Sequence, residues 1–341
     1  MTRPSIVFRG DASHALGYGH LARLCALIEE LEPAVLPVPM FGGDATVAAW
    51  ARSNGVVADV RPEAQPWTTG DVLAAAEAPG VRAIVIDGPR LAAELAPALA
   101  ARGLRAILID DSGDCALPAD VIVNHNFHAP KLAAPYPHAR LRLLGRRYLL
   151  LRRTIRRYPR GSCRPVDGAR LRVVVSFGAS DPVGATARTL RLLPADRPLA
   201  VTVVAGPGFR DHADLAIAAA IATAAGHTVE IAASPDDLGA LFVAADAAIC
   251  AAGGTLGELA YLGCPALAFA IVPDQLLPVR AQVRSGLISG GRTWSDTPDD
   301  LVRAELFTFL TSNQRRRIQR QRALATADGN GARRILAEAL A

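Results

Sequence analysis

The stretch from Ala247 to Gln275 restricts the folds open to this chain more than any other. It begins with a short apolar run, passes through Gly253-Gly254 and continues into a helical pattern at Thr255. A short run that is apolar at every position is typical of a strand buried on both faces, and the glycines indicate a tight turn. Thr255 is predicted as an N-cap, with Glu258 as its capping-box partner. The stretch therefore predicts a strand–turn–helix unit.

This turn also has a chemical consequence. Backbone N–H groups at a helix start that is entered through glycines point outward and carry a partial positive charge. An anion such as a diphosphate can bind there without a cationic side chain. Two interpretations of Glu258 stay open: it caps the helix, or it accepts hydrogen bonds from a ribose diol.

Strand and helix patterns alternate along most of the 341 residues. In the first half, strands are predicted at 5–9, 34–41, 56–60, 83–87, 106–110 and from 121, with helices at 20–31, 44–53, 71–77 and 91–102. In the second half, strands at 172–177, 200–205, 228–231 and in the opening stretch alternate with helices at 184–193, 213–225 and 235–244. Helices at 277–285, 298–310, 313–325 and 332–340 follow, and no strand is predicted after Ala270. The pattern indicates an α/β fold of parallel sheets covered on both faces.

Length and composition predict two domains. The usual domain size is roughly 150 residues, and a hydrophobic content of 51% can fill two cores. Prolines, glycine and charges mark residues 158–169 as a linker between a domain at 1–157 and a domain at 170–325. Residues 326–341 are expected to form a helix free to cross back onto the first domain. The predicted architecture is two Rossmann-like, doubly wound domains that face each other across a cleft.

Cysteine usage and hydropathy exclude several classes of protein. The five cysteines form no C-x-x-C pair, which favours a reducing, cytoplasmic location and excludes a zinc ribbon. No apolar run approaches the roughly 18 residues that a membrane span needs, and no signal peptide is seen.

The net charge of +5 is concentrated in residues 146–160 and 315–322. Solvated helix faces explain most such runs, and an anionic membrane surface or nucleic acid is the alternative. Nucleic acid is not predicted, because aromatic residues are not interleaved with the basic ones. The segment 146–157 is left as a candidate for peripheral contact with a membrane or an acidic glycan.

His20 is the leading catalytic candidate. It follows Gly17-Tyr18-Gly19 at the carboxyl end of the first strand, after a loop that carries Asp11, Ser13 and His14. The positive end of the following helix disfavours imidazolium and favours a neutral ring that can accept a proton near neutral pH. A general base needs that state. An imidazole that merely caps or packs against the loop fits the position equally well.

Acidic and histidine residues end several other strands. Asp87 and the pair Asp110-Asp111 lie where the ligand crevice of an open parallel sheet is expected, although such residues also start turns. His125 and His128 have no glutamate or cysteine at ligand spacing, and a loop cannot impose helical geometry on them. We therefore expect a polar loop at the rim of the cleft, with no metal and no cofactor.

Six sequence blocks resemble one known family. They are Arg9-x-Asp11, Leu16-Gly-Tyr-Gly19-His20-Leu-Ala-Arg23, Asp110-Asp111 with Asp120-x-x-x-Asn124-x-Asn126, Leu144-Gly-x-x-Tyr148-x-Leu150-Leu151-Arg152, Ser176-Phe-Gly-x-Ser180-Asp181-Pro182 and the opening stretch. In this order, over about residues 5–280, they resemble the PseG/SpsG family, which includes UDP-sugar hydrolases of pseudaminic acid biosynthesis.

The resemblance implies a GT-B fold with UDP bound by the C-terminal domain. It implies an inverting, metal-free attack of water on the anomeric carbon of UDP-2,4-diacetamido-2,4,6-trideoxy-β-L-altropyranose, with His20 as the base. Gly178, Ser180, Gly254 and Thr255 would surround the phosphates, and Glu258 would bind the ribose. The remaining candidate site residues are Asp274 on the catalytic side and Arg9, Asp11, Gly19, Asn124, Gly206, Gly253 and Gln275 on the binding side.

Three departures from the family pattern bear on the sugar. Asp87-Gly88-Pro89 replaces the usual Asp-Ser-Tyr, Asp274-Gln275 replaces Asn-Gln, and Ala179 replaces a glycine. The sequence therefore supports the nucleotide more firmly than the sugar or the acceptor. Two other functions stay open: a GT-B glycosyltransferase that acts on a surface polysaccharide, flagellin or metabolite, and a nucleotide-sugar-binding subunit without turnover.

Overall fold

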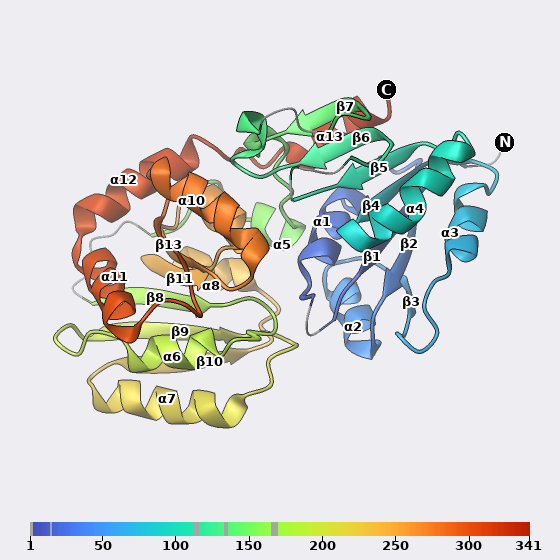
Figure 1. Cartoon of the computed structure of the whole chain (residues 1–341). Coiled ribbons are helices and arrows are strands. Elements are labelled where there is room, and N and C mark those ends of the chain that lie inside the picture. The colour runs from blue at the N-terminus through green and yellow to red at the C-terminus, as the bar shows by residue number, and fades with distance from the viewer. Residues whose placement is uncertain (1–2, 14–15, 112, 114–115, 133–135, 165–169) are drawn as a thin grey trace. The chain divides into compact units, whose positions relative to one another are not determined.

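The computed structural model describes residues 3–13, 16–111, 113, 116–132, 136–164 and 170–341 (Figure 1). His14, Cys115 and residues 165–169 of the predicted linker therefore lie outside the described residues. The chain forms two compact units, one made of Met1–Arg153 with Gly329–Ala341 and the other of Thr154–Asp328. Within the predicted linker, the backbone N–H of Gly161 donates to the carbonyl of Tyr261 at 3.0 Å, which attaches this part of the stretch to the second unit.

The first unit contains a parallel sheet in the order β3-β2-β1-β4-β5-β6-β7. The strands are β1 (Ser5–Asp11), β2 (Leu36–Gly42), β3 (Asp59–Arg61), β4 (Val81–Asp87), β5 (Ala106–Ile109), β6 (Ala119–Asn124) and β7 (Ala139–Leu144). The helices are α1 (Gly19–Ile28), α2 (Ala45–Ser53), α3 (Thr69–Ala76), α4 (Pro89–Ala101) and α13 (Gly331–Ala339), with short 3₁₀ turns η1 (Ala129–Lys131) and η2 (Arg146–Tyr148).

Both faces of this sheet are covered. Val7, Ile84 and Leu108 pack with apolar residues of α3 and α4 on one face. Their strand neighbours, such as Ile6 and Phe8, are equally buried and face the other way, because successive side chains of a strand alternate. This double burial explains why the central strands, such as β4 and β5, are largely apolar.

The second unit repeats the design with a sheet in the order β10-β9-β8-β11-β12-β13. The strands are β8 (Leu171–Ser176), β9 (Leu199–Ala205), β10 (Thr228–Ala233), β11 (Ala247–Ala251), β12 (Ala266–Ala270) and β13 (Ser289–Thr293). The helices are α5 (Arg153–Arg156), α6 (Ala185–Arg191), α7 (His212–Ala224), α8 (Leu238–Ala244), α9 (Thr255–Leu262), α10 (Leu276–Arg284), α11 (Asp299–Thr311) and α12 (Asn313–Leu324), with η3 (Pro273–Gln275). The prediction of two doubly wound parallel sheets is confirmed.

Two strands were not predicted. β13 contradicts the expectation that no strand follows Ala270. Its glycines, Gly290 and Gly291, have φ values of +88° and +92°, and the register with β12 shifts beside them. Thr293 is its one β-branched residue, so the segment shows little of the pattern by which strands are recognised. No strand was predicted at β7, because its exposed arginines interrupt the apolar pattern.

Many arginines of the two basic runs are committed to contacts within their own unit. Arg147 pairs with Glu338 at 3.3 Å, and Arg157 pairs with Asp237. In α12, Arg316 is fully buried and donates to the carbonyl of Phe309 at 2.5 Å, while Arg320 donates to the carbonyls of Cys163 and Gly263 at 2.8 Å each. These residues hold the chain together, which explains part of the positive charge without an external partner.

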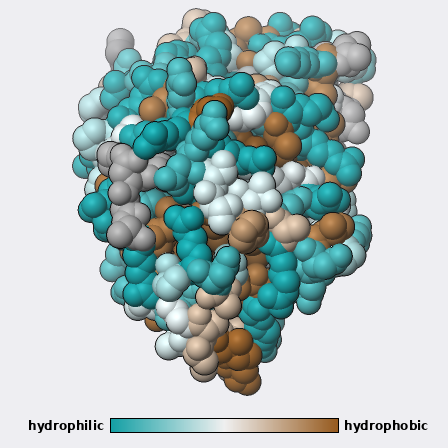
Figure 2. All heavy atoms as spheres, turned by 90° about the vertical axis from the view of Figure 1, so that its left-hand side faces the viewer, coloured by the Kyte–Doolittle hydropathy of each residue, from teal (hydrophilic) through white to brown (hydrophobic). Residues whose placement is uncertain are grey.

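Figure 2 shows the side of the molecule that carries α11 and α12. Hydrophilic residues cover much of this face, and hydrophobic residues lie between them in small groups. Among the described residues, no helix combines the length and the apolar character needed to cross a membrane.

Candidate functional site

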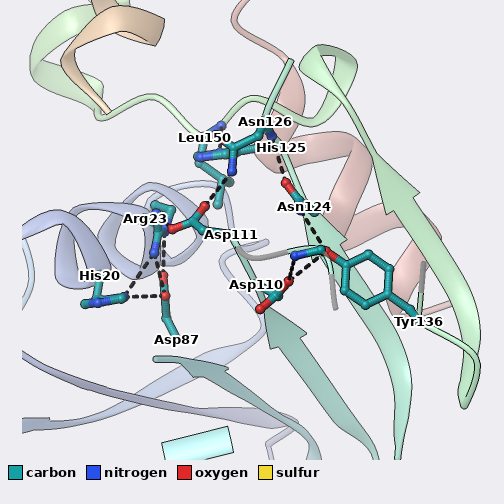
Figure 3. A network of polar contacts seen from close by, with 11 residues as sticks. His20, Arg23, Asp87, Asp110, Asp111, Asn124, His125, Asn126, Tyr136 and Leu150 are labelled. Atoms are coloured by element: carbon teal, nitrogen blue, oxygen red, sulfur yellow. Dashed lines mark hydrogen bonds and ion pairs between the residues drawn. The ribbon is translucent and has the colours of Figure 1, made fainter. Parts of the chain in front are cut away.

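His20 lies where the first sheet changes winding direction. The chain continues from β1 to β2 on one side, whereas β4, the other neighbour of β1, leads on to β5. Ligands of open parallel sheets bind beyond the carboxyl ends of the strands at such a point. α1 begins there, and its second residue, His20, places Nδ1 2.7 Å from Oδ1 of Asp87, the last residue of β4 (Figure 3).

Arg23, one helical turn after His20, donates two hydrogen bonds to the same carboxylate. Its Nε lies 2.7 Å from Oδ2 of Asp87, and its Nη2 lies 2.8 Å from Oδ1. The side chain of Asp87 is fully buried. Burial alone would raise the pKa of Asp87, but Arg23 and His20 outweigh it and hold the pKa below its ordinary value. Asp87 is therefore an ionised carboxylate in the folded protein.

This geometry assigns the tautomer of His20. A carboxylate can only accept, so the short contact with Asp87 requires that Nδ1 carries the hydrogen. Nη2 of Arg23 also lies 3.0 Å from Nδ1 of His20. Since both nitrogens then carry hydrogen, this contact is not a hydrogen bond, and Nη2 donates to Asp87 instead. In the neutral ring with this tautomer Nε2 carries the lone pair, and the side chain is 21% exposed. An oriented imidazole with an open Nε2 is the arrangement that a general base requires.

A chain of polar contacts extends from Arg23 across the ends of β5 and β6 (Figure 3). Arg23 Nη1 donates to Asp111 Oδ2 at 2.7 Å, and Asn126 Nδ2 donates to Asp111 Oδ1 at 2.8 Å. Asn124 Oδ1 accepts the backbone N–H of Asn126 at 3.0 Å.

The chain ends at a buried tyrosine. Asn124 Nδ2 donates to the hydroxyl of Tyr136 at 2.7 Å, and that hydroxyl donates to Asp110 Oδ2 at 2.7 Å. Asn124, predicted to bind substrate, is completely buried. In the structure it fixes the loop that presents Asn126, and a direct substrate contact stays a prediction.

The histidines after β6 do not form the polar rim that the sequence suggested. His125 and His128 are buried, with 6% and 5% exposure. His125 Nδ1 accepts the backbone N–H of Leu150 at 3.1 Å, and burial together with Arg23 lowers its pKa to about 4, so the ring is neutral. The described residues contain no group of three or more His, Cys, Asp or Glu side chains suited to a metal.

Arg9 and Asp11, two more predicted binding residues, pair with each other at the end of β1. Arg9 is 3% exposed, and its Nη1 also donates to the carbonyl of Gly10 at 2.8 Å. Gly19 is the first residue of α1, directly beside His20. The Arg9–Asp11 pair fixes the end of β1, from which the loop to His20 departs. A contact of Arg9 or Asp11 with substrate stays a prediction.

The second unit has its own change of winding direction, between β8 and β11. The loops that follow these strands hold Gly178, Ser180, Gly253 and Gly254. Gly178 has a φ of +87°, and a Cβ at either Gly178 or Gly254 would meet no atom within 4 Å. Ser180 is buried at 6% exposure. The space that a side chain would occupy at these two glycines is therefore open, at the position where such sheets bind anions.

Gly206 has a different task. A Cβ at this residue would lie 2.5 Å from Cα of Ala179, so glycine is required for the loop after β9 to pack against the loop after β8. Gly208 N donates to the carbonyl of Ala179 at 3.0 Å in the same contact. Gly206 thus shapes the predicted anion site by packing.

The capping box predicted at Thr255 is wrong. α9 begins at Thr255, so the N-cap is Gly254, and no side chain caps it. Because Gly254 already adopts helical angles (φ −55°, ψ −27°), the helix starts one residue earlier than the pattern suggested. Glu258 is 7% exposed and lies in the first turn. Glu258 is therefore not the capping-box partner of an N-cap Thr255, and ribose binding stays a prediction.

Asp274 and Gln275 lie after β12 in η3. Gln275 Oε1 accepts the backbone N–H of Ile271 at 2.9 Å, which closes the turn, and a Cβ on Gly253 would lie 3.6 Å from Gln275 Nε2. Asp274 is exposed. The structure thus places Gln275 beside the predicted anion site, whereas the proposed catalytic role of Asp274 stays a prediction.

Sequence reasoning gave Arg23 and Asn126 no role in the site, and it placed Asp111 at the expected crevice without identifying its partners. The spacing of His20 and Arg23, three residues apart on one helix, places both on the same face and could have indicated Arg23. The partners of Asp111 come from other strand ends, and no local pattern identifies them. A cavity of about 670 Å³ between α10, α11, α12 and β13 was also not foreseen, and it contains none of the predicted residues.

Comparison with known proteins gives the fold. No protein-family model matches the chain, and no curated protein matches it. Among solved structures, MurG from Acinetobacter baumannii has a TM-score of 0.68 at 16% identity, covering 98% of this chain and 99% of MurG. LpCGTa in complex with UDP has a TM-score of 0.62 at 15% identity, with 99% of each chain covered.

A putative UDP-N-acetylglucosamine 2-epimerase from Listeria monocytogenes is similar as well. It has a TM-score of 0.62 at 13% identity and covers 99% of this chain and 96% of its own. At these identities the likeness establishes fold and not activity. The chain has the GT-B fold, built from two Rossmann-like units.

Proposed function

We propose that this protein is a UDP-sugar hydrolase. The observation that carries the proposal is the hydrogen bond of 2.7 Å between His20 Nδ1 and the buried carboxylate of Asp87, which leaves Nε2 open as a base. The structural neighbours support the broader class, because they include glycosyltransferases and an epimerase named for UDP-sugars, and two of them hold UDP.

The second unit is the proposed UDP-binding part. Gly178 and Gly254 offer backbone N–H groups to the diphosphate, and the start of α9 adds the positive end of its dipole. Glu258, in the first turn of the same helix, accepts the ribose hydroxyls. Ser180 and Thr255 complete the surroundings of the phosphates.

The proposed reaction is a direct displacement at the anomeric carbon. His20 Nε2 takes a proton from water while the water oxygen forms a bond to C1, and the C1–O bond to UDP breaks with its electron pair leaving on the phosphate oxygen. Attack opposite the leaving group inverts the configuration. Because the phosphate site stabilises the departing charge, no general acid is required. Asp87 stabilises the imidazolium that forms on His20.

The test is incubation with UDP-2,4-diacetamido-2,4,6-trideoxy-β-L-altropyranose in the absence of any acceptor. The proposal expects stoichiometric release of UDP and free sugar, with inverted configuration at C1 in an NMR spectrum recorded before the free sugar mutarotates. UDP-glucose serves as the control substrate. Binding of UDP without turnover of either sugar would overturn the hydrolase proposal and leave a nucleotide-sugar-binding protein.

A GT-B glycosyltransferase is the second candidate. The departures at Pro89 and Asp274 favour it: Pro89 is the first residue of α4, two positions after Asp87, and Asp274 is exposed. Both changes replace family residues expected near the sugar. UDP release that requires an added hydroxyl acceptor would select this candidate over the hydrolase.

A further inference from the structure

Asp111 holds Arg23 from the side opposite Asp87. The two carboxylates share one guanidinium, with Nη1 of Arg23 on Asp111 and Nε and Nη2 on Asp87 (Figure 3). We propose that Asp111 is a positioning residue that acts through Arg23 to make His20 a stronger base. This inference rests on the proposed function, in which His20 accepts a proton from water.

A charge count supports the assignment. Arg23 carries +1, and Asp87 and Asp111 carry −1 each, so the hydrogen-bonded group has a net charge of −1 while His20 is neutral. Burial alone would raise the pKa of Asp111, but Arg23 outweighs it and the pKa falls to about 2, so this carboxylate is ionised. When His20 accepts a proton, the group becomes neutral. The negative charge of Asp111 therefore favours protonation of His20.

The other charged groups at this edge of the sheet do not replace Asp111. At the end of β1, Arg9 and Asp11 pair with each other and contribute no net charge. After β6, His125 is neutral, and Arg146 in η2 adds a positive charge near it. Asp110 accepts from Tyr136 and from the backbone N–H of Gly113 at 2.8 Å.

The motif Asp120-x-x-x-Asn124-x-Asn126 gains a role in this arrangement. Asp120 Oδ2 accepts the backbone N–H of Ala106 at 2.9 Å and ties β5 to β6. Asn124 fixes the backbone of Asn126, and the amide of Asn126 orients Asp111. Asn126 thus binds Oδ1 of Asp111, while Oδ2 of the same carboxylate accepts from Arg23.

The direct test follows the ring of His20 by NMR in the free protein, so it needs no substrate. In Asp111→Asn, the pH midpoint of the His20 Cε1–H signal should fall by roughly half a pH unit to one unit, because a negative charge near the ring is lost. The effect is modest because the side chain of Asp111 is 37% exposed. Glu94→Gln, the same charge change on an exposed residue of α4, should leave the midpoint unchanged.

Turnover provides the second readout. A weaker base lowers the plateau of kcat in Asp111→Asn, while the acid limb of the pH–rate profile moves to lower pH and KM stays unchanged. Asp111→Glu restores the charge and should restore the midpoint. An unchanged midpoint in folded Asp111→Asn overturns the inference, whether or not the protein hydrolyses the sugar.

A second variant covers the case in which Asp111→Asn does not fold. Asn126→Ser leaves Asp111 in place but removes the amide that orients it. The midpoint should then shift in the same direction by a smaller amount. A midpoint equal to that of the wild type would overturn the inference. A midpoint shift without any sugar hydrolysis would sustain the role of Asp111 and refute the proposed function instead.

Discussion

The two units present different chemistry at equivalent places of the same topology. At the change of winding direction in the first unit, His20, Asp87 and Arg23 form a network of charged side chains. At the corresponding place in the second unit, Gly178 and Gly254 expose backbone. Both places lie beyond the carboxyl ends of neighbouring parallel strands, where helices begin. The sheet therefore fixes the location, and the loop residues decide what the location can do.

This difference separates two tasks that one substrate requires. Proton transfer needs a titrating side chain that is kept in one tautomer, and the hydrogen bond to the buried Asp87 does this for His20. Binding of a diphosphate needs N–H donors and little steric bulk, and glycine supplies both. If the division is right, a change in one unit should affect turnover and a change in the other should affect nucleotide binding.

The largest effect is expected from His20→Gln. Glutamine keeps a polar side chain but cannot accept a proton near neutral pH, so kcat for hydrolysis should fall by roughly 10²-fold to 10⁴-fold. The affinity for UDP, measured by calorimetry, should stay within about twofold, because the nucleotide is assigned to the other unit. His138→Gln, an exposed residue of the first unit, is the matched control. Near wild-type turnover in His20→Gln would refute the assigned base.

A smaller effect is expected from Gly254→Ala. The backbone of Gly254 is already helical, so alanine fits without strain, and its methyl group points into open space. If the diphosphate occupies that space, the UDP affinity should fall by roughly fivefold to tenfold, the loss of about one hydrogen bond. The melting temperature should hardly change.

Gly70→Ala gives the comparison for that variant. Gly70 lies in the first turn of α3 in the other unit and also has room for a methyl group. Its UDP affinity should equal that of the wild type. Equal affinities in Gly254→Ala and Gly70→Ala would place the diphosphate elsewhere.

Much of this fold was predictable from local pattern. The central strands are buried on both faces, so their sequences are largely apolar, and most predicted elements agree with the structure. β13 was not predictable, because Thr293 is the only strand-favouring residue of its Ser-Gly-Gly-Arg-Thr sequence, and the segment pairs with β12 through its position in the fold. The N-cap of α9 was misassigned by one residue, because Gly254 adopts helical angles and the helix therefore begins at Thr255.

The site residues also separate into those that local sequence indicates and those that only the tertiary fold brings together. His20 and the glycine loops could be found because each lies in one continuous stretch that signals a helix start. The network around Asp111 could not, because Arg23, Asp111 and Asn126 are brought together by strand order alone. Strand-end acids are common turn formers, so their positions gave no indication of which cation each would meet.

The smallest effect concerns acid stability and distinguishes the charged edge from the glycine edge without any ligand. Asp87 and Asp111 have folded pKa values below their ordinary ones, about 2 for Asp111, so they stabilise the folded state above about pH 4 and lose that contribution as the pH falls toward 2. Wild type and Asp111→Asn should therefore differ most in urea midpoint near pH 5. Between pH 5 and pH 2, the difference in unfolding free energy between wild type and Asp111→Asn should shrink by about 1 kcal/mol. This figure is kept small because solvent screens the partly exposed Asp111 side chain. Because the asparagine side chain of the variant cannot ionise, a difference that is constant with pH would show that the Arg23–Asp111 ion pair contributes nothing to folding.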